Sequence, residues 1–192
     1  MKLLIDRIVN DGKVLSGEVL KVDSFLNHQL DVELLEELAK EWFERFKDCG
    51  VTKILTIESS GIALAALTAR YFKVPAVFAK KAKSSNIGDE LYSSKVVSYT
   101  RGQAYEVVVA KSYISKGDRV LLIDDFLAHG SALKVLINLV ELGGATVVGA
   151  GVAIEKAFQN GGSDIRALGY RVEALAKIKS MSRDGKIEFD EN

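Results

Sequence analysis

Apolar runs in the middle of the chain alternate with segments whose apolar residues recur at helical spacing. Short apolar runs bounded by polar turn residues are typical of strands buried on both faces of a parallel sheet. The predicted strands are 53–57, 76–79, 120–123 and 145–154. One predicted helix starts at the N-cap Asp31 and ends before Gly50, one covers 61–71, and one runs from Ser131 to Gly143. This order predicts an α/β fold with a mainly parallel sheet flanked by helices.

The two ends of the chain lie outside this alternation. Residues 1–30 are mixed, with Gly12 and Gly17 as turn signals around short β-like pieces. Residues 171–178 and 186–189 are also typical of strands. We expect the two ends to pack together as a small cap over the carboxyl edge of the sheet, where open α/β sheets bind ligands.

Between the second and third predicted strands the chain is polar. Residues 82–94 show no periodicity, and we predict a mobile loop that closes over a ligand and excludes water. Residues 96–100 and 105–110 are rich in β-branched and aromatic residues on either side of Arg101-Gly102. They predict a hairpin.

Composition and charge limit the class of protein. The chain has 192 residues, 48% of them hydrophobic, so we expect one domain over 1–192 with its core at about 35–160. Lys+Arg and Asp+Glu both count 26, and this balance argues against a nucleic-acid-binding module, which needs a basic face. Cys49 is the only cysteine, and no apolar run reaches membrane-spanning length. We therefore expect a soluble cytoplasmic protein that binds neither nucleic acid nor membranes.

The stretch 120–132, VLLIDDFLAHGSA, carries the strongest functional signal. Asp124 and Asp125 are predicted to close a buried strand, and 126–130 to form a short loop before the helix. Carboxylates accept hydrogen bonds from sugar hydroxyls, while loop amides and helix N-terminal amides hold phosphate. A ribose 5-phosphate fits both features. The alternative is a pair of carboxylates that only caps the helix.

Residues 120–132 resemble the signature of the type I phosphoribosyltransferases, which use phosphoribosyl pyrophosphate (PRPP). Three further segments, 22–29 (VDSFLNHQ), 58–61 (ESSG) and 155–158 (EKAF), resemble the xanthine-specific branch of this family in order and spacing. The resemblance implies the type I phosphoribosyltransferase fold. It also implies transfer of the 5-phosphoribosyl group of PRPP to xanthine, giving xanthosine 5-phosphate and pyrophosphate in purine salvage.

The resemblance also implies which residues bind PRPP. As catalytic residues, Asp124 and Asp125 would hold the ribose 2- and 3-hydroxyls and stabilise a cation-like sugar. The 5-phosphate would lie on Ala128, His129, Gly130, Ser131 and Ala132, and the pyrophosphate on Ser59, Ser60, Gly61 and Lys81. On residue type alone, a plain helix N-cap explains 58–61 equally well, and Lys81 could belong to a solvated basic run. We interpret His129 as a loop side chain rather than a general acid or base.

Four residues are implied for the base: Leu20, Asn27, Lys156 and Phe158. An ammonium donates and never accepts, so Lys156 suits the C6 carbonyl of a 6-oxopurine and disfavours adenine. Phe158 could stack on the purine or be a core aromatic. No residue decides between the 2-oxo group of xanthine and the 2-amino group of guanine, so guanine and hypoxanthine stay open as substrates.

Mg²⁺ is the implied cofactor, bound mainly through PRPP, pyrophosphate and water, with few or no direct protein ligands. The family also implies a homodimer. A PRPP-sensing transcription regulator without catalysis is the rival from another class. It needs an added DNA-binding domain, and residues 1–50 are too short and too weakly basic to form one. An assembly protein with a vestigial site fits poorly with the acids, the loop and the lysines together.

Overall fold

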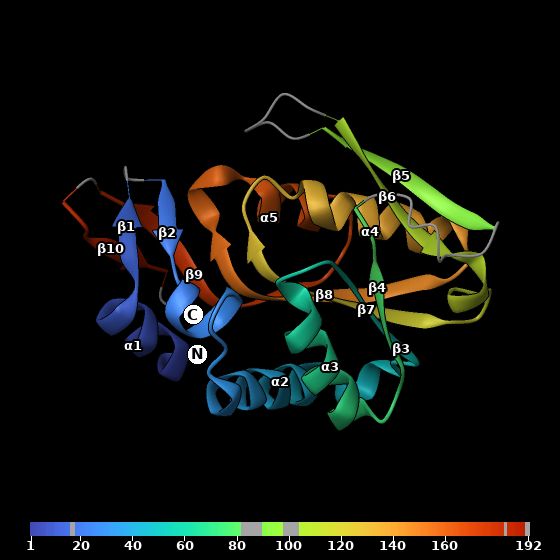
Figure 1. Cartoon of the computed structure of the whole chain (residues 1–192), viewed down its shortest axis with the longest axis horizontal. Coiled ribbons are helices and arrows are strands. Elements are labelled where there is room, and N and C mark those ends of the chain that lie inside the picture. The colour runs from blue at the N-terminus through green and yellow to red at the C-terminus, as the bar shows by residue number, and fades with distance from the viewer. Residues whose placement is uncertain (16–17, 82–89, 98–103, 183, 191–192) are drawn as a thin grey trace.

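The protein is built around a six-stranded sheet with helices on both faces (Figure 1). The computed structural model describes residues 1–15, 18–81, 90–97, 104–182 and 184–190. The strand order is β10-β9-β8-β7-β3-β4, and all neighbours are parallel except the pair β9–β10. The strands are β3 (Lys53–Ile57), β4 (Ala76–Ala79), β7 (Arg119–Leu127), β8 (Thr146–Lys156), β9 (Val172–Met181) and β10 (Ile187–Phe189). The mainly parallel α/β fold is confirmed.

Helices cover the two faces of the sheet in pairs. Helices α2 (Val32–Phe46) and α3 (Gly61–Phe72) lie on one face, and α4 (Ser131–Leu142) and α5 (Gly161–Ala167) lie on the other (Figure 1). Each predicted helix of the middle of the chain is present. The Asp31 carboxylate accepts a hydrogen bond from the Leu34 amide at 3.1 Å, so the predicted N-cap of α2 is confirmed.

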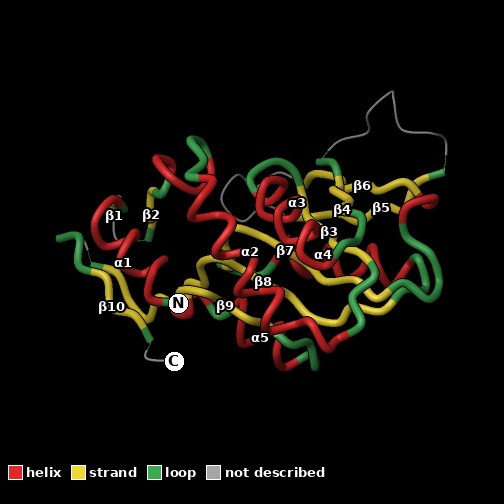
Figure 2. The backbone as a smooth tube through the Cα atoms, turned by 90° about the horizontal axis from the view of Figure 1, so that it is seen from below, coloured by secondary structure: helices red, strands yellow, loops and turns green. Residues whose placement is uncertain are grey.

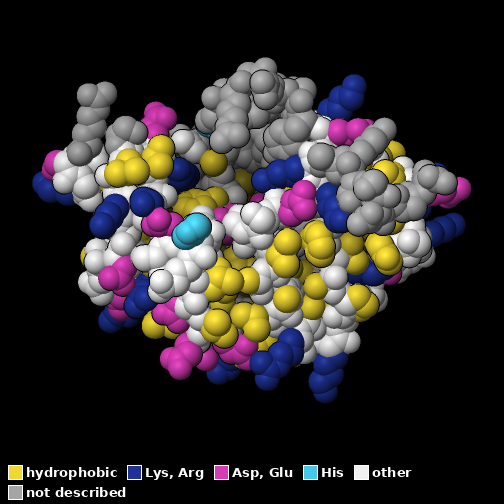
Figure 3. All heavy atoms as spheres, in the orientation of Figure 1, with side chains coloured by type: hydrophobic (Ala, Val, Ile, Leu, Met, Phe, Trp, Pro, Cys, Tyr) yellow, Lys and Arg dark blue, Asp and Glu magenta, His cyan; other side chains and the backbone are white. Residues whose placement is uncertain are grey.

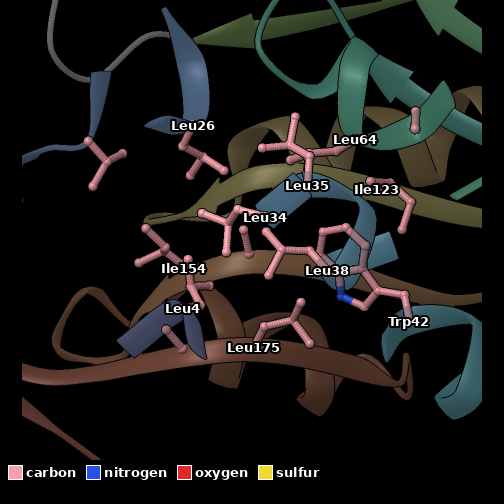
Figure 4. Close-up of a cluster of buried hydrophobic side chains, with 14 of the residues drawn as sticks. Leu4, Leu26, Leu34, Leu35, Leu38, Trp42, Leu64, Ile123, Ile154 and Leu175 are labelled. Atoms are coloured by element: carbon pink, nitrogen blue, oxygen red, sulfur yellow. The ribbon is translucent and has the colours of Figure 1, made fainter. Parts of the chain in front are cut away.

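Each face of the sheet has its own apolar core because the parallel strands are buried on both sides. On the α2–α3 face, Trp42 packs among leucines of α2 and against Ile123 of β7 and Leu175 of β9 (Figure 4). On the other face, α4 packs Leu136 and Val140 over Leu122. All of these side chains are fully buried. The strand that carries the two acids therefore lies between two cores and has little freedom to move.

The N-terminal segment differs from the prediction. Residues 1–30 were predicted as turns and short β-like pieces, and the strands β1 (Lys13–Leu15) and β2 (Val19–Lys21) are present. Lys2–Asp11, however, forms helix α1. The reason is tertiary, since Leu4 and Ile8, four residues apart, are fully buried against the α2 side of the core. A π-helix, Asp23–Asn27, then leads to α2.

The two ends do pack together, but the C-terminal strands were wrongly placed outside the sheet. β9 pairs in parallel with β8 and so belongs to the sheet itself, with β10 as its antiparallel edge. The Met1 ammonium donates to the Leu175 carbonyl at 2.5 Å, and Lys177 pairs with Asp190 at 3.0 Å. Figure 2 shows α1 beside β9 and β10. The N-terminal segment therefore packs against the C-terminal strands, which themselves belong to the sheet.

The predicted hairpin is confirmed, with an earlier start. β5 (Leu91–Val97) pairs antiparallel with β6 (Ala104–Ala110). The end of the predicted loop 82–94 is therefore strand, because Tyr92 and its neighbours pair with the apolar strand β6 and Ser94 accepts a bond from Asn138 of α4 at 3.0 Å. Residues 82–89 and the turn at 101–102 lie outside the described residues. In the described part of the chain, none of the helices has the length and apolarity to span a bilayer.

Candidate functional site

The two acids lie inside β7 rather than at its end. The strand continues through Leu127, because Phe126 and Leu127 pair with Ile154 and Glu155 of the equally long β8. The prediction that the acids close the strand was therefore wrong, and the loop shrinks from 126–130 to 128–130. β7 pairs with β8 both before and after the two acids, and this pairing fixes their backbone. The two carboxylates are therefore preorganised.

Asp124 and Asp125 are buried, with 5% and 7% of their surfaces exposed. The Asp125 amide donates to Asp124 Oδ1 at 2.9 Å. Burial raises the pKa of Asp124 well above its usual range, the negative charge of Asp125 raises it further, and the Lys81 ammonium acts in the opposite direction. The two carboxylates thus form a buried hydrogen-bond acceptor. The protonation state of Asp124 depends on the charges and hydrogen-bond donors beside it.

Asn27 connects the N-terminal segment to the acids. It ends the π-helix Asp23–Asn27, and its Nδ2 donates to Asp125 Oδ2 at 3.1 Å across 98 positions of sequence. Phe25 and Leu26, beside it, are fully buried and anchor this turn in the core. The structure therefore brings Asn27, expected at the base, next to an acid expected at the ribose.

The loop 128–130 leads directly into α4. Gly130 is the N-cap of this helix with φ +76°, a left-handed conformation that favours glycine, and no side chain caps the helix. The first turn of α4 carries no acid, and Ser131 and Ala132 are half-buried while His129 is exposed. Backbone amides at the start of a helix suit an anion.

Gly161 holds this loop from behind, a contact that the sequence analysis missed. Its amide donates to the Ala128 carbonyl at 3.0 Å, and a Cβ at 161 would overlap that carbonyl and come within 2.5 Å of the Gly130 amide nitrogen. Only glycine allows so close an approach. The Gly161-Gly162 pair was the available signal in the sequence.

Beneath this contact lies a buried ion pair, also missed. Glu155 is 1% exposed, and Arg166 of α5 donates to both of its carboxylate oxygens at 2.7 Å. A Cβ at Gly162 would overlap Glu155 Oε1, so α5 packs directly on this carboxylate. The fork-like geometry fixes α5, and with it Gly161, relative to β8.

The segment 58–61 follows β3 and reaches the acids from the other side. The Glu58–Ser59 peptide bond is cis, and Glu58 Oε1 accepts a hydrogen bond from the Lys81 amide at 2.7 Å. Ser60 occupies the N-cap position of α3 without a side-chain capping bond, so the alternative of a plain N-cap does not account for its hydroxyl. A Cβ at Gly61 would lie 3.3 Å from Asp124 Oδ1. The structure thus brings 58–61 and Lys81 beside the acids.

Lys156, the last residue of β8, lies beneath the N-terminal segment. Its ammonium donates to the Glu18 carbonyl at 2.6 Å and lies 5.5 Å from the centre of the Phe126 ring. Burial lowers the pKa of Lys156, and the Glu18 charge acts in the opposite direction. Any ligand carbonyl bound by this ammonium would have to replace the Glu18 carbonyl.

The other two residues expected at the base differ in exposure. Leu20 lies on β2, is 6% exposed and belongs to the core of the α2–α3 face, so its side chain is in place to support the N-terminal segment. Phe158 is 36% exposed, in the turn Ala157–Gln159 after β8. That exposure rules out the alternative of a core aromatic.

Comparison with known proteins agrees with this geometry. Residues 21–177 match the family model described as phosphoribosyl transferase domain. The chain is 53% identical over 190 residues to a xanthine phosphoribosyltransferase of Lachnoclostridium phytofermentans, covering 98% of both chains. It is 53% identical over 191 residues to one of Bifidobacterium adolescentis, covering 98% of this chain and 99% of the relative.

Solved structures show the same fold. A crystal structure of adenine phosphoribosyl transferase from Trypanosoma brucei superposes with a TM-score of 0.77 at 20% identity, covering 95% of this chain and 82% of that one. The resemblance found in the sequence motifs is confirmed. On these matches, and on a buried acid pair flanked by the segment 58–61 and the start of α4, the chain belongs to the phosphoribosyl transferase family.

Proposed function

We propose that this protein transfers the 5-phosphoribosyl group of PRPP to xanthine, giving xanthosine 5-phosphate and pyrophosphate. The observation that carries the proposal is the buried acid pair Asp124–Asp125, with 58–61 on one side and the start of α4 on the other. The relatives that share about half of their residues with this chain over their full length bear the name of this activity. Pyrophosphate release with PRPP, Mg²⁺ and each purine base in turn tests the proposal. Pyrophosphate release that is fastest with xanthine supports the proposal. Absence of pyrophosphate release with every base tested overturns it.

The acids act on the sugar. In this proposal Asp124 and Asp125 accept hydrogen bonds from the ribose 2- and 3-hydroxyls and so fix the ring. As the bond to pyrophosphate breaks, positive charge spreads over the anomeric carbon and the ring oxygen, and the fixed carboxylates stabilise it electrostatically. The bond to a ring nitrogen of the base then forms, and the base loses a proton as the nucleotide forms. Pyrophosphate leaves beside Ser59, Ser60 and Lys81.

Mg²⁺ enters as part of the substrate, the Mg²⁺ complex of PRPP. Among the described residues, no group of three or more His, Cys, Asp or Glu side chains could hold a metal ion. Phosphate and hydroxyl oxygens and water are the ligands that Mg²⁺ prefers, and PRPP supplies them. Bound Mg²⁺ would supply positive charge to the pyrophosphate, and Lys81 offers a further positive charge from the chain.

The proposal predicts how the 5-phosphate is bound. A structure with ribose 5-phosphate is expected to show the phosphate on the backbone amides of 128–132, because the chain has no arginine between Arg119 and Arg166 to form a nearby clamp. Crystallography of this complex checks the prediction. A phosphate beside Arg119, with the amides of 128–132 free of it, would contradict it.

Lys156→Met is predicted to weaken xanthine binding selectively. Loss of a charged donor to a buried carbonyl costs roughly 1.5–3 kcal/mol, or about ten- to a hundredfold in affinity. PRPP affinity is expected to stay near the wild-type value, because PRPP binds the 58–61 and 124–132 elements. Titration of each ligand against wild type, Lys156→Met and the control Lys179→Met, which alters an exposed lysine of β9, separates the effects. Equal weakening of both ligands would mean that Lys156 supports the fold instead.

We further propose a cytoplasmic homodimer with one domain per chain and a cap over the active-site edge from the N- and C-terminal segments. Support for association is an apolar surface over α3 and β4, where hydrophobic side chains gather on the face shown in Figure 3 and Phe78 of β4 is 43% exposed. Support for the cap is the pair of contacts that residues 18–27 make with Asp125 and Lys156.

A further inference from the structure

Thr56, in the middle of β3, carries a buried hydroxyl that no atom of the described residues satisfies. The residue is 1% exposed, and its Oγ1 has no hydrogen-bond partner. A second buried threonine, Thr68 of α3, shows the usual arrangement, with its hydroxyl donating to the Leu64 carbonyl at 2.8 Å. A buried polar group without a partner is costly, so such groups are rare and call for an explanation.

The Thr56 hydroxyl lies against the catalytic pair. A Cβ added at Gly61 would overlap Thr56 Oγ1 and would lie 3.3 Å from Asp124 Oδ1 and 3.4 Å from the Ile123 carbonyl. The hydroxyl and the Asp124 carboxylate are thus neighbours around the Cα of Gly61. Behind that glycine, the hydroxyl is screened from solvent and hence from any substrate. Two acceptors, the Asp124 carboxylate and the Ile123 carbonyl, lie around the same glycine, and of these only Asp124 belongs to the catalytic pair.

We propose that Thr56 is a positioning residue, whose hydroxyl donates to the Asp124 carboxylate once the substrate is bound and the acid must carry its negative charge. This inference rests on the proposed function. In the free protein, burial and the neighbouring Asp125 carboxylate raise the pKa of Asp124 and favour the protonated acid, while the Asp125 amide, which donates to Asp124 Oδ1, and the Lys81 charge oppose them. A donor poised beside the carboxylate stabilises the ionised form and fixes its orientation toward the ribose hydroxyls.

The test compares Thr56→Val, which keeps the shape and removes the hydroxyl, with Thr56→Ser, which keeps the hydroxyl. Thr56→Val is expected to lower kcat about ten- to a hundredfold, the usual effect of a hydrogen bond to a charged group, with KM for PRPP much less affected. The acidic limb of the kcat profile moves to higher pH, since without the donor Asp124 holds its proton more tightly. The acidic limb of the pH profile of kcat/KM is expected to stay in place, because this profile reports the free enzyme, in which the hydroxyl makes no hydrogen bond to Asp124. Thr56→Ser restores kcat and the kcat profile.

Thermal unfolding of the free protein gives a readout without activity. Thr56→Val is expected to unfold at the wild-type temperature or above, because it removes a hydroxyl that has no partner. The matched control Thr68→Val removes a satisfied hydroxyl, lowers the melting temperature and leaves both pH profiles unchanged. If Thr56→Val does not fold, the pair Thr56→Ala and Thr56→Ser, which differ by the hydroxyl, carries the same comparison.

Wild-type kcat in Thr56→Val would overturn the positioning role. So would a slower Thr56→Val with an unshifted kcat profile, or a Thr56→Ser that stays as slow as Thr56→Val, since both results indicate packing. Wild-type protein assayed beside the variants separates the two proposals. If the wild type releases no pyrophosphate with any base, the proposed function fails. If the wild type and Thr56→Val release pyrophosphate at equal rates, only the positioning role of Thr56 is refuted.

Discussion

Replacing Asp124 and Asp125 together by Asn is expected to abolish phosphoribosyl transfer while the fold is kept. Removal of one electrostatic group that stabilises the transition state typically costs about 10²–10³ in rate, and the pair acts as a unit, so at least this loss is expected. Pyrophosphate release with PRPP, Mg²⁺ and xanthine measures it. The double replacement of Asp6 and Asp48, both exposed, is the matched control and should stay at the wild-type rate.

The single variant Asp124→Asn tests the electrostatics of the site independently of activity. The folded pKa of Asp124 is raised, so the folded state binds its proton more tightly than the unfolded state. Stability therefore falls as the pH rises from the ordinary Asp pKa through the folded pKa of Asp124, so this buried acid is a cost to the folded state at neutral pH. Asp124→Asn should raise the melting temperature at neutral pH, with the gain shrinking as the pH falls toward the ordinary Asp value. A double variant with near wild-type turnover, or an Asp124→Asn less stable at neutral pH, would contradict this assignment.

Arg166→Met is expected to lower the free energy of unfolding by about 3 kcal/mol. It would leave Glu155, which is 1% exposed, as a buried carboxylate without its bidentate partner, and breaking one side of a buried pair costs about 3–5 kcal/mol. The partial exposure of Arg166 places the expectation at the lower end of that range. Urea unfolding measures the change.

Two further variants test whether the loss of stability in Arg166→Met comes from leaving a buried charge unpaired. Lys134→Met breaks the exposed ion pair of Lys134 and Asp164, which also joins α4 to α5, and should cost less than about 1 kcal/mol. Glu155→Gln combined with Arg166→Met removes both charges and should recover much of the loss. Wild-type stability in Arg166→Met would mean that the ion pair contributes little to the docking of α5.

The sequence predicts most of the central unit because its signals are local. Apolar runs buried on both faces indicate parallel strands, and Asp31 and the paired glycines at 143–144 indicate where helices begin and end. Helix α1 was missed because its isolated sequence is mixed, and its stability comes from burying Leu4 and Ile8 against distant parts of the chain. Strand β9 was misplaced for a related reason. Its place in the sheet depends on pairing with β8, and local residue patterns do not specify which strands pair.

For the candidate site, too, local sequence signals and long-range contacts account for different features. The sequence by itself indicated the acids and the small-residue loop as a candidate site, because these residue types at this spacing suit a ribose phosphate, and the family resemblance added the lysine at the end of β8. Only the tertiary structure decided that Asn27 contacts Asp125, that Gly161 backs the loop at 128–130, and that the Thr56 hydroxyl lies beside Asp124. Each of these contacts joins residues 30 or more positions apart. Their distances depend on how the strands align and how the helices pack on them, which no local pattern of residues specifies.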